Sequence, residues 1–140
     1  MALDITHREQ EGIEILDLRG RLTLGEEDLT LRNEINRAAA AGRTRLVLDL
    51  GKVTDIDTTG LGTLLLAQTR LRNAGGGLAL ANLRPAHMEL LVVAKMEAIF
   101  EVFDRHQDAV NSFFPDRHTS QIDVLEFVES MRRKRSQRGS

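Results

Sequence analysis

The residues of this chain best suited to chemistry are two adjacent threonines that follow an aspartate. They lie in the segment Asp55-Ile56-Asp57-Thr58-Thr59-Gly60-Leu61-Gly62. Asp57, Thr58 and Thr59 are all residue types that cap the start of a helix. The N–H groups of a first helical turn lack partners and, together with the helix dipole, favour an anion. A phosphate on one of these hydroxyls would therefore meet donors, and Gly60 and Gly62 would leave room for it.

The same residues also make an ordinary helix cap. Most caps of the Asp-Thr-Thr type carry no chemistry, so on Asp57, Thr58 and Thr59 alone the plain cap is the simpler interpretation. Which interpretation holds depends on the elements that position these residues.

The elements around the segment predict a strand that leads into a helix. The apolar run Leu46–Leu50 is typical of a strand covered on both faces. A leucine-rich, proline-free stretch over 58–73 predicts a helix, which Gly75 and its two following glycines end.

Two strands are predicted before this unit, over 3–6 and 12–18, followed by a helix over 26–41. The apolar residues of the second strand change face between Ile15 and Leu16, so that either a bulge lies there or both faces of the strand are covered.

The second half of the chain continues the alternation of strands and helices. A strand is predicted over 78–81, a helix from Pro85, a strand or extended link over 99–103 and a helix over 104–114. Because the first two strands have no helix between them, we expect an α/β fold with a mixed sheet of four to five strands and helices packed on it.

Pro115 marks a predicted boundary between a domain over 1–114 and a C-terminal extension over 115–140. Val124, Leu125, Val128 and Met131 fit one face of an amphipathic helix, and a basic run over 132–135 precedes an end predicted to be disordered. The extension is too short to bury a core of its own. Its cations either complement the helix dipole or mark a helix for partner docking or self-association.

Composition excludes several classes of protein. The 140 residues carry a net charge of -2 and include no Cys, Trp or Tyr, which argues against direct nucleic-acid binding and excludes thiolate metal sites. No apolar run approaches the ~20 residues of a membrane span, and the first residues do not form a signal peptide. We therefore expect a cytoplasmic protein.

Other chemical sites find little support. His7, His87, His106 and His118 are not at metal-ligand spacing, and the glycines match neither a P-loop nor a dinucleotide motif. We therefore predict no metal and no cofactor. An aspartyl-phosphate receiver that uses Asp49 lacks the acidic pair and the lysine it would need, and no nucleophile with a base is visible.

The strand Leu46–Leu50, followed by Val53 and by residues 56–65, resembles the central signature of STAS domains, the family of the anti-sigma factor antagonists. The likeness extends over roughly residues 3–114. It implies a non-enzymatic regulator in which the second hydroxyl of the motif, here Thr59, is the phosphoacceptor, and in which Asp57, Thr58, Thr59, Gly60, Leu61 and Gly62 contact a partner.

The resemblance also implies the partners. An unphosphorylated antagonist binds an anti-sigma factor that is itself a serine/threonine kinase, phosphorylation weakens the complex, and a PP2C-type phosphatase resets it. The alternative is a structural STAS subunit of a stressosome or of a lipid or anion transporter complex, without phosphorylation turnover. Two departures are the use of Thr where Ser is usual and the absence of an Asp after Leu22, for which Glu26 or Glu27 is a candidate substitute.

Overall fold

The computed structural model describes residues 3–138, without the side chains of Glu26 and Glu27. Within this range five strands and five helices follow one another along the chain. They are β1 (Asp4–Gln10), β2 (Ile13–Leu22), α1 (Glu26–Ala40), β3 (Arg45–Ile56), α2 (Thr58–Asn73), β4 (Gly77–Ala81), α3 (Pro85–Val93), β5 (Glu101–Phe103), α4 (His106–Asn111) and α5 (Val124–Arg138).

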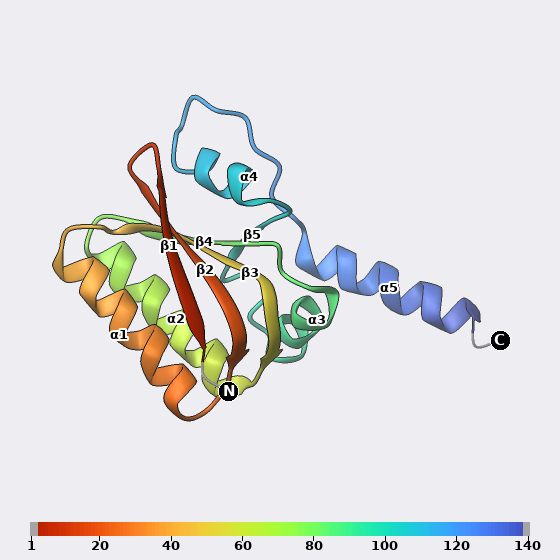
Figure 1. Cartoon of the computed structure of the whole chain (residues 1–140). Helices are drawn as coiled ribbons and strands as arrows, with labels where there is room; N and C mark the ends of the chain where they lie inside the picture. Colours follow the sequence, from red (N-terminus) through yellow and green to blue (C-terminus); the bar gives the residue numbers. More distant parts are fainter. Residues whose placement is uncertain (1–2, 139–140) are drawn as a thin grey trace.

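One five-stranded sheet organises the domain, with its strands in the order β1-β2-β3-β4-β5 (Figure 1). β1 is antiparallel to β2, and every later pair of neighbours is parallel. This arrangement confirms the predicted mixed sheet, in which a hairpin starts the chain and helical crossovers connect the parallel strands.

Two apolar clusters lie on opposite faces of the sheet. The larger joins one face of β2 and β3 to α1, α2, α3 and α5, while the smaller joins the other face to α4. Figure 1 shows α1 and α2 side by side, and α4 at a distance from them beyond the sheet. The central strands are therefore covered on both faces, as the nearly continuous apolar runs in their sequences require.

The change of face within β2 has a simple explanation. Ile13 and Ile15 pack in the smaller cluster under α4, whereas Leu16 and Leu18 pack in the larger one. Both faces are thus covered at this point. The register of β2 against β3 does shift, but farther along, after Asp17 and again after Gly20.

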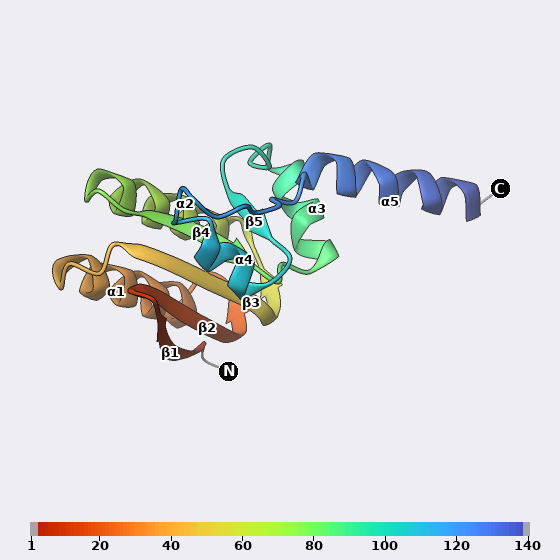
Figure 2. The same cartoon turned by 90° about the horizontal axis from the view of Figure 1, so that it is seen from above.

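The last helix, α5, docks through its first two turns. Val124 and Val128 are buried in the larger cluster beside α3, and the N–H of Ile122 donates to the carbonyl oxygen of Val102 at 2.8 Å. Beyond these turns α5 extends away from the domain (Figures 1 and 2).

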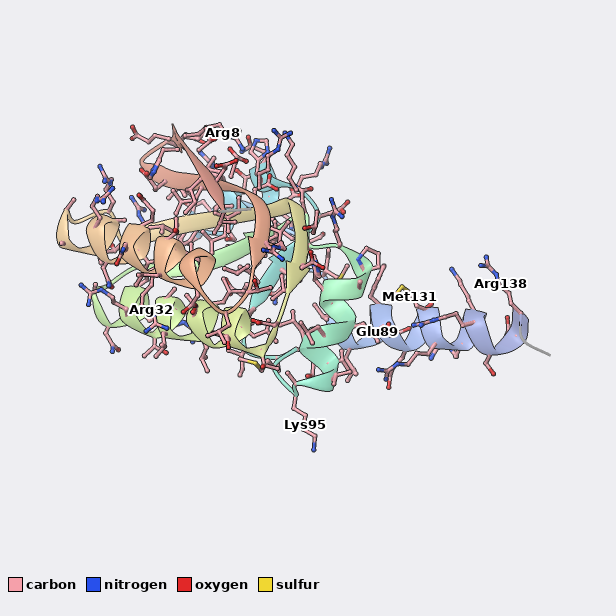
Figure 3. All side chains as sticks on the ribbon, turned by 60° about the horizontal axis from the view of Figure 1, so that its bottom comes forward. Arg8, Arg32, Glu89, Lys95, Met131 and Arg138 are labelled. Carbon is pink, nitrogen blue, oxygen red and sulfur yellow. The ribbon has the colours of Figure 1, made fainter. Side chains whose placement is uncertain are left out.

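α5 continues through the basic run to Arg138, where the sequence suggested a disordered end. Arg, Lys and Gln are good helix formers, which favours this continuation. Arg135 also pairs with Glu89 of α3 at 2.9 Å. In Figure 3 Glu89 and Met131 lie at the junction of the two helices and Arg138 at the distal end. Residues 139–140 lie outside the described range. The domain boundary at Pro115 stays a prediction.

Candidate functional site

The end of β3 and the start of α2 bring the predicted site residues together. β3 ends at Ile56, Asp57 adopts an extended conformation as N-cap, and α2 begins at Thr58. Asp57 Oδ1 accepts a hydrogen bond from the N–H of Gly60 at 2.8 Å. Of the three capping candidates in the sequence, Asp57 is therefore the one that caps α2.

Asp57 also binds the connection between β2 and α1 to the start of α2. Its Oδ2 accepts a hydrogen bond from the N–H of Leu24, in the connection between β2 and α1, at 3.0 Å. Its own N–H donates to the carbonyl oxygen of Leu22 at 3.3 Å. The carboxylate of Asp57 thus joins the start of α2 to the β2–α1 connection, which lies more than 30 residues earlier in the sequence.

The charge of Asp57 is stabilised by these contacts. Desolvation raises the pKa of its carboxyl group, but hydrogen bonds from the N–H groups of Gly60, Leu24 and Thr59 outweigh this effect, and the pKa lies below its ordinary value of 3.8. Asp57 is therefore ionised at neutral pH. It already uses helix-start donors that the sequence suggested for a phosphate.

The two threonines differ in exposure. The side chain of Thr58 is exposed and that of Thr59 is half-buried, both in the first turn of α2. The backbone N–H of Thr59 donates to the ionised carboxylate of Asp57, which places residue 59 next to that charge.

Gly60 and Gly62 have different roles. A Cβ atom on Gly60 would lie 2.2 Å from the carbonyl oxygen of Leu22, whereas a Cβ atom on Gly62 would meet nothing within 4 Å. Gly60 therefore permits close packing of α2 on the end of β2, and this packing, not room for a phosphate, explains the glycine. Leu61 is buried in the core at 2% exposure. The solvent-accessible part of the predicted contact set is thus Asp57, Thr58, Thr59 and Gly62.

An exposed leucine at the site was missed from the sequence. Leu24 is 74% exposed although its N–H is held by Asp57. Leu29 in α1 and Leu66 in α2 are also exposed. Their position outside the predicted apolar stripes is the signal that could have identified them.

A groove runs between α1 and α2, beginning one turn beyond Thr59. Its volume is about 620 Å³, and Arg32, Leu66 and Arg70 are among its lining residues. The hydroxyl of the buried Thr63 donates to Asp28 across it, which ties the two helices together. The side chains of Glu26 and Glu27, the candidates for the missing acidic contact, lie outside the described part of the structure.

A sequence model of the STAS domain matches residues 4–109 of the chain. The chain belongs to the STAS domain family. The match spans β1 to α4 and includes the whole Asp57–Gly62 segment.

Known proteins similar to this STAS domain carry related names. BtrV of Bordetella bronchiseptica, named as an anti-sigma factor antagonist, is 29% identical over 111 residues, which are 79% of this chain and 95% of that protein. The structure of a protein from Thermotoga maritima, also named as an anti-sigma factor antagonist, has a TM-score of 0.72 at 18% identity and covers 78% of this chain and 93% of its own.

A third similar structure is that of the Bacillus cell fate determinant SpoIIAA in its phosphorylated form. Its TM-score is 0.61 at 16% identity, and the match covers 78% of this chain and 98% of that one. At such identities the structural likeness establishes the fold of the STAS domain and nothing finer.

Two of the four histidines, His7 and His87, have structural contacts. His7 lies between Glu14 and Glu34, at 3.0 and 3.1 Å. His87 is buried in α3, where desolvation lowers its pKa against the opposing effect of a bond to the backbone of Thr54. No group of three or more His, Asp or Glu residues within the described range could hold a metal ion. None of the helices of residues 3–138 combines the length and apolar character that crossing a bilayer requires.

Proposed function

We propose that this chain is an anti-sigma factor antagonist that is switched off by phosphorylation of Thr59. In this proposal its unphosphorylated form binds a cytoplasmic anti-sigma factor, which is a serine/threonine kinase, and releases the sigma factor. The kinase then phosphorylates Thr59, the complex dissociates, and a PP2C-type phosphatase restores the active form. The chain itself catalyses no reaction.

The observation that carries the proposal is the position of Thr59 beside a carboxylate that already uses the helix-start donors. A phosphate adds about -1.5 to -2 charges. Because the N–H groups of Gly60 and Leu24 are bonded to Asp57, much of this charge would remain uncompensated at the surface. A partner that fits the neutral hydroxyl would then face repulsion and a desolvation cost of a few kcal/mol, which corresponds to roughly a hundredfold weaker binding.

The names of similar proteins support the same role. BtrV and the Thermotoga protein are named as anti-sigma factor antagonists, and one structure of SpoIIAA is of a phosphorylated form. The aligned part of BtrV is nearly its whole length, so no further domain of BtrV is needed to account for its name.

The first experiment is mass spectrometry of the intact protein and its peptides, isolated from its own cells before and after treatment with a PP2C-type phosphatase. We expect one phosphate, located on Thr59 and removed by the phosphatase. Thr58→Ala is the matched control, because Thr58 is adjacent and more exposed. A phosphate that persists in Thr59→Ala contradicts the assignment of Thr59 as the phosphoacceptor. A protein without phosphate under all growth and stress conditions contradicts the proposal and favours a constitutive structural subunit.

Binding variants test the switch itself. Thr59→Glu should abolish binding to the anti-sigma factor, while Thr59→Ala should bind and no longer respond to the kinase. Equal affinity of the two variants, measured by calorimetry, would contradict a charge-based switch. Self-association through α5 is tested in the same samples by sedimentation of the full chain.

A further inference from the structure

A second, cationic site lies on the sheet face opposite α1 and α2. It is a hollow of about 690 Å³ lined by Arg19, Gly20, Arg21, Lys52, Thr54 and Arg84. Four of these six residues carry a positive charge and none carries a negative one. The hollow includes none of the residues from Asp57 to Gly62, so it is separate from the site of the proposed function.

The alternation of side chains along the strands sets the face on which the hollow lies. Val53 of β3 and Leu22 of β2 point into the larger cluster under the helices. Their neighbours Lys52, Thr54 and Arg21 therefore point to the opposite face. α4 covers that face where the smaller cluster lies, packing mainly on β4, β3 and β5, and the residues that line the hollow at the far end of β2 and β3 are not part of that cluster.

Two of the cations lie opposite each other on neighbouring strands. Arg19 and Lys52 are paired residues in the parallel β2–β3 ladder, and Asp4 of β1 is the residue paired with Arg19 on its other side. No carboxylate of the described residues forms an ion pair with either of them. The nearby carboxylate of Asp17 is taken by Arg8, which binds it through two hydrogen bonds of 2.6 and 2.9 Å.

The backbone shapes the floor and the rim of the hollow. β2 has a register shift after Gly20, whose φ of 116° is a conformation that favours glycine. Thr54 Oγ1 lies 3.2 Å from the carbonyl oxygen of Gly20 and 3.0 Å from Asp55 Oδ2, so this lining hydroxyl has two acceptors within donating distance. At the rim Arg84 donates from Nε and Nη2 to the carbonyl oxygen of Gly51, at 3.2 and 3.1 Å, which fixes one edge of its guanidinium group. Irregularities of this kind redirect side chains and are frequent beside binding sites.

We propose that this hollow binds a small anion that carries two adjacent phosphate groups. Arg19, Lys52 and the remaining donors of Arg84 hold the phosphates, since guanidinium and ammonium groups are the side chains best suited to them. One phosphate bridges the opposed pair Arg19 and Lys52, and the second faces Arg84. The volume lies in the range of small-molecule sites and leaves space for a group attached to the phosphates.

Calorimetric titration of the full chain with inorganic diphosphate tests the proposal, at an ionic strength of about 0.05 M where screening is weak. We expect saturable one-to-one binding, weaker binding of inorganic phosphate, and a loss of roughly tenfold or more in Arg19→Gln/Lys52→Gln because charge-assisted contacts are removed. Arg70→Gln/Arg72→Gln removes the same charge from the end of α2 and should bind as the wild type does.

Several results would overturn the proposal. They are the absence of saturable binding by the wild type, undiminished binding by Arg19→Gln/Lys52→Gln, and binding of phosphate as strong as that of diphosphate.

Urea unfolding provides a second measurement without ligand. Because neither cation forms an ion pair with a carboxylate of the described residues, the unfolding midpoint of Arg19→Gln/Lys52→Gln should be unchanged or higher, and a lower midpoint would show that these cations are already satisfied within the protein.

Discussion

The close approach of α2 to the end of β2 makes Gly60→Ala and Gly62→Ala a matched pair with opposite expected effects on stability. A Cβ atom at position 60 would lie 2.2 Å from the carbonyl oxygen of Leu22 and 3.0 Å from its Cγ. The oxygen belongs to the backbone of β2 and cannot rotate away, so the helix start would have to move by about an ångström. That movement would also lengthen the 3.3 Å hydrogen bond from the N–H of Asp57 to the same oxygen.

The size of the effect follows from two opposing contributions. Overpacking in a close-packed region costs about 1–3 kcal/mol. Replacing a helical glycine by alanine contributes up to about 1 kcal/mol of stabilisation. We expect Gly60→Ala to lower the free energy of unfolding by about 2 kcal/mol, because the added Cβ clashes with a backbone oxygen and the cost lies at the upper end of the range. Gly62→Ala adds its methyl group in open space and should raise that free energy by about 0.5–1 kcal/mol.

Urea unfolding followed by circular dichroism measures both variants, and equal slopes would show that the unfolded states are comparable. In thermal unfolding, 2 kcal/mol corresponds to a decrease in Tm of roughly 8 °C for a chain of this size. A Gly60→Ala variant as stable as the wild type would refute the close contact. A loss of stability in Gly62→Ala equal to that in Gly60→Ala would show that the first turn of α2 rejects any side chain.

Three further predictions test the cap, the last helix and the exposed leucine. Asp57→Ala should lower the free energy of unfolding by about 1 kcal/mol at neutral pH. Because the pKa of Asp57 is lowered in the folded state, this difference should be complete above its ordinary pKa of 3.8. Acid unfolding experiments should show that the difference is lost as the pH falls further. Val128→Ala should destabilise the chain by about 1–2 kcal/mol in urea unfolding because Val128 is fully buried, whereas Leu125→Ala, at a 39% exposed position, should change it by less than about 0.5 kcal/mol. Leu24→Ser should leave the unfolding midpoint almost unchanged and weaken binding to the anti-sigma factor kinase in calorimetry, and unaltered binding would exclude Leu24 from the interface.

Local sequence signals predicted the start of α2 well. The cap and the leucine pattern gave a helix over 58–73, the range that the structure shows. They succeeded because capping chemistry and 3.6-residue periodicity act over a few residues. The identity of the capping residue among Asp57, Thr58 and Thr59 needed the structure, since all three side chains can accept the bond.

Long-range contacts explain what the sequence did not predict. The strand was predicted only over Leu46–Leu50, but β3 continues to Ile56 because Asp55 and Ile56 pair with the last residues of β2 after a register shift. Gly-Lys-Val-Thr-Asp has the composition of a turn, and only this pairing makes it a strand. The bond from Leu24 to Asp57 likewise depends on the packed sheet and has no local signal.

The double role of Asp57 suggests how a change at Thr59 could alter the surface without altering the fold. The same carboxylate holds the start of α2 through Gly60 and the β2–α1 connection through Leu24. A negative charge placed on Thr59, as proposed above, would act on this carboxylate first, because Asp57 caps the helix turn that contains Thr59. Its repulsion would be relieved most easily by loosening the bond to the exposed Leu24, whereas Gly60 is fixed by its contact with β2. The consequence would be confined to one loop and one helix end, since Leu22 and Val53 at the ends of β2 and β3 are fully buried in the larger cluster and have little freedom to respond.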